Sequence, residues 1–411
     1  MKLKILIYGL NYYPEKVGIA KYTTEMADWF KKNKHEVRVI TSNPYFPEWK
    51  LKSNSFKKEI IKSIQIERCM IWVPKKPTAF NRILHLLSFS LTSLPLIIRQ
   101  IFWQPDVIFT IAPSFLCAPN SILISKLCPK RVINWIHFQD LELDAAFNLG
   151  LINNKQIRKI SKIFESIILK NFNVVSAISY SMMNNLSFKG VKKDNLFYLP
   201  NWVDINEIYP KQKFQSKNQY VQKLSLKKNQ IVLMYSGSIN KKQGIDLILK
   251  LINHFKDRED ILWIIAAGGP SYGEIKRYCK SYKNALCLPL QPRKDLNNFL
   301  NIADIHLIPQ KKGAEDLVMP SKLLAILASG KAFIAASSEK SELGKIALQK
   351  GVRVNPDDFN QFKNAINELT KNKDLRNKLG KKARAYAVEN YEKYKLLESL
   401  NKKMIFEVNK K

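Results

Sequence analysis

Residues 309–336, PQKKGAEDLVMPSKLLAILASGKAFIAA, decide the fold of this chain because they predict a strand–helix–strand unit. The apolar residues 305–308 predict a strand that ends where this segment starts. A helix is predicted to begin near Pro320, since proline suits a first helical turn, where its missing N–H needs no partner. The helix ends at Gly330, which tolerates the positive φ of a helix C-terminus, and a second buried strand is predicted directly after it.

The predicted helix presents a hydroxyl and a cation at its N-terminus, from Ser321 and Lys322. Free N–H groups and the positive end of the helix dipole favour an anion there, most naturally a phosphate. The pattern is equally compatible with an ordinary crossover helix whose serine caps the N-terminus and whose lysine is solvated. The segment therefore indicates a phosphate site and leaves the structural alternative open.

The composition is that of a globular chain with an extreme positive charge. Its 411 residues, 46% hydrophobic and 25% charged, predict two or three domains with a large core. A formal net charge of +34 favours phosphorylated ligands, an acidic membrane surface or nucleic acid, although the lysines are spread along the whole chain. The five cysteines form no C-x-x-C pair and predict buried thiols in a reducing compartment.

The first part of the chain alternates strands and helices. Residues 3–10 are too short an apolar run for a secretory signal and are expected to form the first strand, followed by a helix at 19–32 and a strand at 36–41. This order is typical of a doubly wound parallel sheet. The intervening loop lacks G-x-G-x-x-G, which excludes the dinucleotide fingerprint. Gly18, before the helix, either approaches a phosphate or sugar closely or is an ordinary turn glycine.

Residues 42–80 predict irregular loops with aromatic side chains beside lysines on a partly exposed surface. These aromatic residues are Tyr45, Phe46, Trp49 and Trp72. The following residues 82–103 are the most hydrophobic stretch and are long enough to span a bilayer. Charged residues and a proline interrupt them, so we predict a long core helix. A helix that also touches a membrane and a true transmembrane helix remain the alternatives.

The polar, aperiodic residues 205–229 predict a linker between two domains. A first domain then spans residues 1–204, and a second α/β alternation fills residues 230–385. The basic helical residues 386–411 are expected to cross back to the first domain. The predicted fold is therefore α/β, with two doubly wound, Rossmann-like parallel-sheet domains facing each other across a cleft.

Three loops of the predicted second domain follow strands and are expected to meet at one sheet edge. The first carries Lys242, which suits a diphosphate as a point charge. The second is the Gly-Gly-Pro turn at 268–270, whose backbone can approach a ribose or a flat ring. The third opens the helix at Ser321. Each loop alone is weak support, and together they predict a site for one phosphorylated ligand.

One histidine of the first domain, His137, is expected at the end of a strand, where ligands bind in such sheets. A lone histidine also fits a structural role in a core. The nearby acids Asp140, Glu142 and Asp144 resemble a metal cluster, but no histidine or cysteine at ligand spacing supports a metal. Their alternative role is to place negative charge at a helix N-terminus, so no metal site is predicted.

Seven stretches spread over nearly the whole chain carry a resemblance to a known family. They are YGLNYYPEKVGIAKYTTEMADWF, HEVRVITSNPYFPEW, QPDVIFTIAPSFLCAP, WIHFQDLELDAAFNLGL, LPNWVD, YSGSINKKQGID and DLVMPSKLLAILASGKAFIA. The chain resembles GT-B fold glycosyltransferases of family 4 (glycosyl transferases group 1). Within them it is most similar to the fucosyltransferase-like subgroup of colanic-acid and exopolysaccharide biosynthesis. The seven stretches together are specific, although each alone would not be.

The resemblance implies retaining transfer of a sugar from a nucleotide-diphosphate donor on the second domain, without a metal or other cofactor. It assigns the catalytic roles to His137, Lys242 and Lys322. It assigns the donor diphosphate to Gly18, Gly237, Ser238, Lys242, Ser321 and Lys322, and the nucleoside to Gly268, Gly269, Pro270 and Leu290. It assigns the donor sugar to His137, Glu315 and Asp316, and the acceptor side to Tyr13, Tyr45, Trp49 and Asp140.

Three positions depart from the family pattern. Ser238 stands where many members carry arginine, and Lys242 lies one place earlier than the usual lysine. The helix that begins at Ser321 carries Ala325 where relatives carry a ribose-binding glutamate. The resemblance therefore leaves the nucleotide base open, while the Pro-Ser-Lys sequence can still supply the phosphate contacts.

These features predict a cytoplasmic hexosyl- or deoxyhexosyltransferase of exopolysaccharide, capsule or O-antigen assembly. Its expected partners are a nucleotide-diphosphate sugar, a polyprenyl-diphosphate-linked saccharide, and the anionic inner face of the cell membrane, where it would be peripheral. A nucleotide-sugar epimerase on the same fold is one alternative, for which the acids at 140–144 are the carboxylates offered. A non-catalytic basic binder is another, but nucleic acid is not expected because no recognition motif is present.

Overall fold

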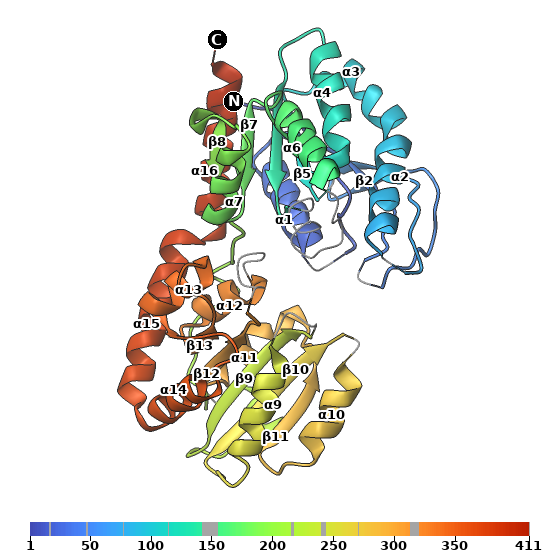
Figure 1. The fold of residues 1–411 in the computed structure, drawn as a ribbon. Helices are drawn as coiled ribbons and strands as arrows, with labels where there is room; N and C mark the ends of the chain where they lie inside the picture. Colours follow the sequence, from blue (N-terminus) through green and yellow to red (C-terminus); the bar gives the residue numbers. More distant parts are fainter. Residues whose placement is uncertain are drawn as a thin grey trace. The chain divides into compact units, whose positions relative to one another are not determined.

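The computed structural model describes residues 1–15, 18–46, 48–76, 78–113, 115–141, 155–214, 218–239, 244–269, 271–312 and 320–410. The chain divides into two compact units (Figure 1). Unit 1 comprises Met1–Asn201 with Lys395–Lys411, and unit 2 comprises Trp202–Tyr394. Each unit is a sheet covered by helices, as the alternation of elements predicts.

Unit 1 is built on an eight-stranded sheet with the order β3-β4-β2-β1-β5-β6-β7-β8. Its strands are β1 (Lys4–Gly9), β2 (Glu36–Ser42), β3 (Lys57–Ile61), β4 (Ile64–Cys69), β5 (Val107–Ala112), β6 (Ile133–Phe138), β7 (Val174–Ala177) and β8 (Leu196–Tyr198). Neighbouring strands are parallel, except for the β3–β4 hairpin at one edge. Strands β5 and β6 are buried along their whole length, as expected of a parallel sheet covered on both faces.

The β3–β4 hairpin corrects the prediction of irregular loops across residues 42–80. Its two-residue turn is formed by Lys62 and Ser63, whose φ angles are 51° and 61°. Such turns usually place Asn and Gly at these left-handed positions. Because lysine and serine occupy them here, the sequence carries no turn signal between the two strands.

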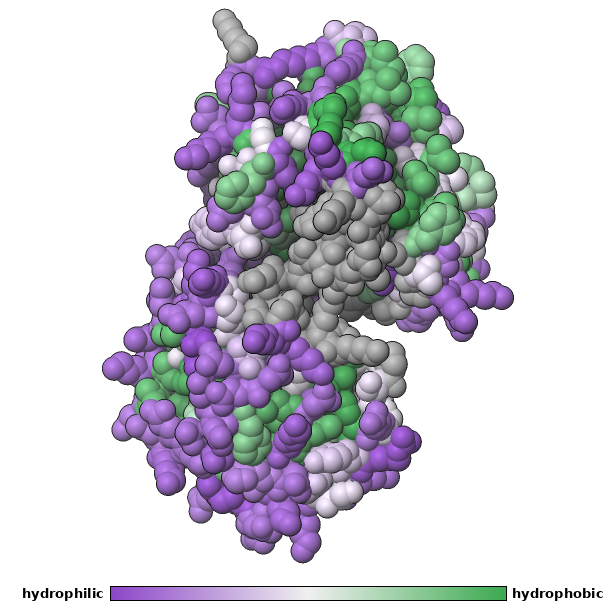
Figure 2. Space-filling view, in the orientation of Figure 1, coloured by the Kyte–Doolittle hydropathy of each residue, from purple (hydrophilic) through white to green (hydrophobic). Residues whose placement is uncertain are grey.

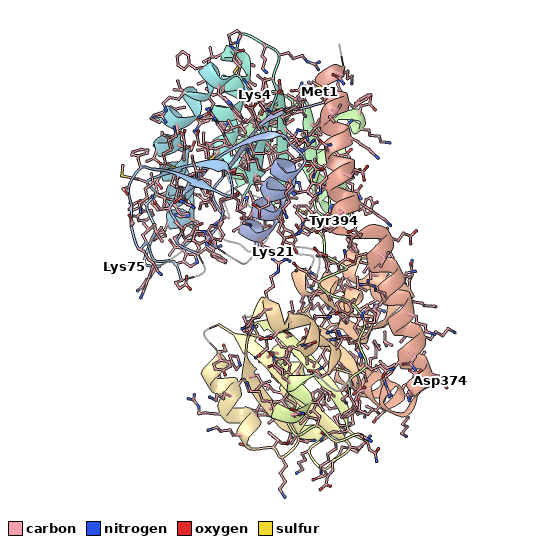
Figure 3. All side chains as sticks on the ribbon, turned by 180° about the vertical axis from the view of Figure 1, so that it is seen from behind. Met1, Lys4, Lys21, Lys75, Asp374 and Tyr394 are labelled. Atoms are coloured by element: carbon pink, nitrogen blue, oxygen red, sulfur yellow. The ribbon has the colours of Figure 1, made fainter. Side chains whose placement is uncertain are left out.

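Helices connect these strands and cover both faces of the unit 1 sheet. They are α1 (Ile19–Lys32), α2 (Ala79–Ile98), α3 (Gln100–Trp103), α4 (Ala118–Leu127), α6 (Lys155–Leu169), α7 (Tyr180–Phe188) and α16 (Lys393–Asn409). Right-handed crossovers place α2, α4, α6 and α7 on one face. Figure 3, which views the molecule from behind, shows α1 and α16 on the other face.

Helices α2 and α3 occupy the very hydrophobic residues 82–103. The inner side of α2 packs in the core through Phe89 and Ile97, whereas Phe80 and Leu91 are 67% and 69% exposed. The prediction of a core helix is therefore confirmed for the inner face of α2, whereas its outer face is exposed. By length and composition, α2 contains the one segment among the described residues that could cross a bilayer.

Unit 2 is built on a six-stranded, fully parallel sheet with the order β11-β10-β9-β12-β13-β14. Its strands are β9 (Ile231–Ser238), β10 (Ile261–Gly268), β11 (Ala285–Pro289), β12 (Ile305–Pro309), β13 (Ala332–Ala336) and β14 (Val352–Val354). Its helices are α8 (Gln219–Lys223), α9 (Ile245–His254), α10 (Tyr272–Lys280), α11 (Leu296–Asn301), α12 (Ser321–Ser329), α13 (Glu342–Lys350), α14 (Phe359–Lys371) and α15 (Lys373–Asn390). Two residues of the segment predicted as a linker, Tyr220 and Leu226, are buried in the unit 2 core.

The helix of the deciding segment, α12, is held at its C-terminal end by α15. Gly330 follows α12 with a φ of 66°, and a Cβ at Gly380 of α15 would lie 2.1 Å from the Gly330 carbonyl oxygen. Arg384 of α15 donates hydrogen bonds to the carbonyl oxygens of Ala328 and Ile208, at 2.9 and 2.8 Å. These contacts fix the position of α12 within unit 2.

Gly380→Ala should destabilise unit 2, because the added methyl group overlaps the Gly330 backbone and α12 must move away from α15. Overpacking of this kind costs about 1–3 kcal/mol, more than the roughly 0.5–1 kcal/mol that alanine gains over glycine inside a helix. Denaturant unfolding measures the change. Gly273→Ala in α10 is the matched control, since nothing lies within 4 Å of that Cβ position. Equal stability of the two variants would contradict the α12–α15 contact.

Candidate functional site

The three loops expected to bind a ligand leave the same edge of the unit 2 sheet. Strands β9, β10 and β12 are parallel, and β9 lies between the other two, so their carboxyl ends share one edge. They end at Ser238, Gly268 and Pro309. Helix α12 follows β12 and returns to the parallel strand β13, so its N-terminus also lies at this edge. The predicted common edge is confirmed.

Backbone contacts tie the first two of these loops together. The Ile239 amide donates to the Gly268 carbonyl oxygen at 2.9 Å. A Cβ at Gly269, whose φ is +109°, would lie 3.0 Å from the Ile239 carbonyl oxygen, so glycine serves both the conformation and the close approach. Gly268 packs against Leu290, whose side chain stays exposed. The structure thus brings together Gly268 and Leu290, two residues predicted to bind the nucleoside.

Lys322 lies in the first turn of α12 and points over the end of β9. Its Nζ is 3.4 Å from the Cβ position of Gly237 and 3.8 Å from the centre of the Tyr235 ring. This Nζ is buried and has no hydrogen-bond partner among the described residues. Burying an ammonium group without an anion is costly, so the arrangement indicates a site for an anionic ligand.

Burial lowers the pKa of Lys322 from 10.5 to about 7. A substantial fraction of the molecules therefore carries an uncharged amine here at neutral pH. The face of the Tyr235 ring attracts a cation, but it replaces only part of the lost hydration. A phosphate against Nζ would favour the charged form and raise the pKa again. Ligand binding and protonation of Lys322 are therefore coupled.

Two polar side chains that the sequence reasoning missed follow neighbouring strands at this edge. Gln310 comes after β12 and Ser337 after β13, and their side-chain oxygens, Oε1 and Oγ, are buried without a hydrogen-bond partner in the described part of the chain. Gln310 also packs against the loop before α9, where a Cβ at Gly244 would lie 3.3 Å from its carbonyl carbon. Their position could have identified them, since each is the first polar residue after an apolar strand.

In unit 1, His137 lies near the end of β6 and is buried. Its Nδ1 is 3.0 Å from the Ser176 hydroxyl, which accepts a hydrogen bond from the Trp135 indole at 2.7 Å. The Ser176 hydroxyl donates to the Ile136 carbonyl oxygen at 3.4 Å, so Nδ1 carries the imidazole proton and donates it to Ser176. The unprotonated Nε2 then accepts a hydrogen bond from the Gln139 side-chain nitrogen at 3.1 Å. Burial lowers the pKa of His137 to about 3, so the ring is neutral and its Nε2 is a hydrogen-bond acceptor.

The residues predicted for the acceptor side differ in exposure. Tyr13 is exposed, whereas Tyr45 is buried, with its ring centre 5.5 Å from that of Trp49 and 4.8 Å from that of His85. The expectation of a partly exposed Tyr45 is wrong, because the aromatic rings of this region pack on one another. Asp140, two residues after the end of β6, is half-buried.

Two buried charged residues, also missed from the sequence, fix the loop that carries Tyr13. The Glu15 carboxylate accepts hydrogen bonds from the Tyr45 and Phe46 amides, at 3.0 and 2.9 Å. Arg68 donates to the Tyr13 carbonyl oxygen at 2.5 Å and pairs with Glu59 at 2.6 Å. The loop after β1 is thereby tied to the loop after β2 and to the β3–β4 hairpin.

The loop after β1 ends at Gly18, which precedes α1. Gly18 has a φ of +59° and nothing within 4 Å of its Cβ position. No side chain caps α1 at this residue. Gly18 therefore supplies no capping side chain to the first amide groups of α1, an arrangement that suits an anion.

Some predicted site residues lie outside the described residues, namely Lys242, Pro270, Glu315 and Asp316. Of Ser238 and Ser321 only the backbone is described. Among the described ranges, no group of three or more His, Cys, Asp or Glu side chains could hold a metal ion.

Comparison with known proteins places the chain in a family. Residues 17–207 match the model of Glycosyltransferase Family 4, and residues 216–386 match that of Glycosyl transferases group 1. WcaI of Escherichia coli (strain K12), named as a colanic acid biosynthesis glycosyl transferase, is 37% identical over 355 residues, or 84% of this chain and 86% of WcaI. The chain is a family 4 glycosyltransferase. The resemblance predicted from the seven sequence stretches is confirmed.

Solved structures support the fold. A glycosyltransferase from Rickettsia africae ESF-5 aligns over 100% of both chains with a TM-score of 0.73 at 15% identity. Anabaena HepE in complex with UDP and glucose aligns over 98% of this chain and 99% of its own, with a TM-score of 0.65 at 12% identity. Both sheets and these relatives show that this glycosyltransferase has the GT-B fold, as predicted.

Lys322→Met should raise the stability of the ligand-free protein at neutral pH. The pKa of Lys322 is lowered in the folded state, so between about 7 and 10.5 the unfolded chain binds more protons and the free energy of unfolding rises with pH. Below that window the buried charge costs stability that a methionine does not. Thermal melts should therefore show a higher Tm for the variant at pH 7, with the difference shrinking toward pH 10.5.

The control for this measurement is Lys345→Met on α13, where the lysine is exposed and little change is expected. A Lys322→Met variant that is less stable than wild type by the same margin at every pH would contradict the buried, unpaired amine.

Proposed function

We propose that this glycosyltransferase moves a sugar, with retention of configuration, from a nucleotide-diphosphate sugar to a saccharide acceptor. The observation that carries the proposal is the buried Nζ of Lys322, without a hydrogen-bond partner among the described residues, at the ligand edge of unit 2. A diphosphate supplies both the missing negative charge and the missing acceptor oxygens. Anabaena HepE, solved with UDP and glucose, supports a nucleoside diphosphate and a sugar as ligands.

In the proposed reaction the bond between the anomeric carbon and the diphosphate breaks, and the acceptor hydroxyl bonds to the same face of the sugar. The hydroxyl proton leaves on a phosphate oxygen. Negative charge develops on the departing diphosphate. Lys322 stabilises this charge together with Lys242 and the backbone amides at Gly237 and Ser238. Removing one such donor commonly costs about 2.7–4 kcal/mol. We expect no metal ion to be required.

We assign the other predicted site residues to parts of the substrates according to their place in each unit. The Gly-Gly-Pro turn at 268–270 and Leu290 are assigned to the nucleoside, because Gly268 and Leu290 already contact each other. The neutral His137 is assigned to the donor sugar, whose hydroxyl groups can donate to its Nε2. The N-terminus of α1, which has no side-chain cap at Gly18, is assigned to the diphosphate. Tyr13, Trp49 and Asp140 are assigned to the acceptor, and Glu315 and Asp316 to the donor sugar.

We assign the acceptor to a polyprenyl-diphosphate-linked saccharide of exopolysaccharide assembly. The name of the relative WcaI supports a polysaccharide product. The net charge of +34 supports an acceptor whose lipid diphosphate lies at an anionic membrane face. Such an acceptor is met from the cytoplasmic side, where nucleotide sugars are available.

Nucleoside diphosphates should stabilise the wild-type protein, and comparison of UDP with GDP by thermal shift should identify the base. Saturation at about a hundred times the dissociation constant adds roughly 2.7 kcal/mol. Lys322→Ala should lose most of this shift and lower turnover by about 10²–10³-fold, while unfolding stays cooperative. Lys345→Ala is the matched control. Near-normal turnover of Lys322→Ala, measured with EDTA present, would overturn the placement of the diphosphate.

His137→Ala should lower kcat more than it weakens donor binding, because the assigned contact is with the transferred sugar and not with the nucleotide. Steady-state kinetics and nucleotide titration separate the two effects. His137→Gln, which keeps a neutral hydrogen-bond acceptor, should recover part of the kcat. A loss of UDP or GDP affinity with an unchanged kcat would count against this role.

A further inference from the structure

One face of unit 1 exposes far more hydrophobic surface than a solvated helix layer needs. The outward side of the layer formed by α2, α3, α4 and α6 carries large exposed side chains, which we call the outer apolar face. Its most exposed members are Phe80, Leu91, Phe102, Leu127, Ile160 and Ile167. Figure 2 shows hydrophobic residues gathered over α2, α3 and α4. Contiguous exposed apolar patches of this kind mark interaction sites.

Helix α6 presents its apolar stripe outward in a fixed orientation. Ile160, Ile163, Phe164 and Ile167 follow helical spacing and are exposed by 66%, 52%, 46% and 57%. The opposite side of the helix is held by Glu165, whose buried carboxylate pairs with Lys189 at 2.7 Å. Turning the stripe inward would break this buried ion pair, so the apolar side of α6 stays available to a partner.

Helix α2 is equally fixed to the core and cannot leave it to span a bilayer. Ser93 on its inner side bonds to the Tyr8 hydroxyl at 2.6 Å, and Ser90 donates to the Leu116 carbonyl oxygen at 2.9 Å. Phe89 and Ile97 are fully buried in the same cluster. Although α2 contains a segment long and apolar enough to cross a membrane, only its outer side is free to meet one.

The charges of the four helices identify the partner. Glu165 is the single acidic residue in α2, α3, α4 and α6, and it is buried, so these helices expose no carboxylate. Exposed cations accompany the apolar residues, among them Lys126, Lys159 and Lys162, with Lys75 and Lys76 just before α2. A second copy of the same face would repel this one, whereas an anionic lipid surface complements both its charge and its apolar side chains.

We propose that the outer apolar face of α2, α3, α4 and α6 docks unit 1 on the surface of an anionic lipid bilayer. The apolar side chains enter the boundary between headgroups and acyl chains, and the lysines contact the headgroups. The enzyme then lies on the membrane and does not span it. The inference deepens the proposed function, on which it rests for the choice of a lipid-linked acceptor.

Flotation of the full-length protein with lipid vesicles tests this surface without any sugar donor. The probes are phosphatidylcholine vesicles with and without phosphatidylglycerol, at low and at high salt. Wild type should float with the anionic vesicles and lose part of this binding at high salt. Ile160→Gln combined with Phe164→Gln on α6, and Leu91→Gln combined with Phe102→Gln, should each lower the partition coefficient at least about tenfold.

The control pair is Leu348→Gln with Phe406→Gln, which removes similarly exposed apolar side chains, 52% and 57%, from α13 and α16. This pair should float like wild type. Failure of wild type to bind anionic vesicles, equal binding to neutral vesicles, or wild-type binding by both α6 and α2–α3 variants would overturn the proposal. So would a dimer, detected by light scattering, that the same variants abolish.

The thermal shift with UDP or GDP is measured on the same variants and should equal that of wild type, because none of the changed residues belongs to the proposed donor site. Loss of flotation with an intact nucleotide shift supports the docking surface. An intact flotation result with no nucleotide shift in any protein would instead refute the proposed function and leave the surface standing.

Discussion

The interaction on which the proposed donor site depends is that of one buried amine, Lys322 Nζ, with an aromatic face and with no anion among the described residues. Its place requires three separate features of unit 2. Gly237 adopts beside the amine a positive φ of +151° that glycine tolerates, the ring of Tyr235 lies against the amine, and α12 is held by the contact of Gly330 with Gly380. Burial of this amine is therefore unfavourable, and the diphosphate that we propose as its ligand would relieve the cost at the point where charge develops on the leaving group.

In unit 1, helices must cover both faces of the sheet, and the helix layer on one face also exposes apolar side chains on its outer side. The ion pair between Glu165 and Lys189 shows how this is held. A carboxylate that would have solubilised α6 on the outside is instead used inside to fix the helix. The inner side of α6 thus fixes the helix through an ion pair, and its outer side carries the exposed apolar residues.

Much of the fold could be predicted from the sequence, because buried parallel strands are continuous apolar runs and their helices end at residues such as Gly330. The hairpin at Lys62 and Ser63 could not, since neither residue type signals a left-handed turn. The proposed phosphate site was partly predictable, because its position at a strand end follows from the alternation of elements. The burial of Lys322 was not, since it depends on Tyr235 and Gly237, far away in the sequence.

Periodicity has the same limit in α6. It identifies Ile160, Phe164 and Ile167 as one side of a helix, but it does not say whether that side meets the core or the solvent. Three-dimensional packing decides which side faces the core. In α6 the buried ion pair of Glu165 turns the opposite, apolar side toward the solvent. The roles of Glu15 and Arg68 were equally invisible, because a single charged residue in a loop carries no pattern until its partners are near.

The composition of unit 1 from two pieces of chain has a consequence for its synthesis. Helix α16, with Leu397, Leu400 and Met404 fully buried, belongs to unit 1 but follows all of unit 2 in the sequence. At about 5–20 residues per second, unit 2 takes on the order of 10–40 s to translate. The first 201 residues must wait through this interval with part of their surface uncovered. A nascent chain of this protein is therefore exposed to chaperones and to early membrane contact before unit 1 is complete.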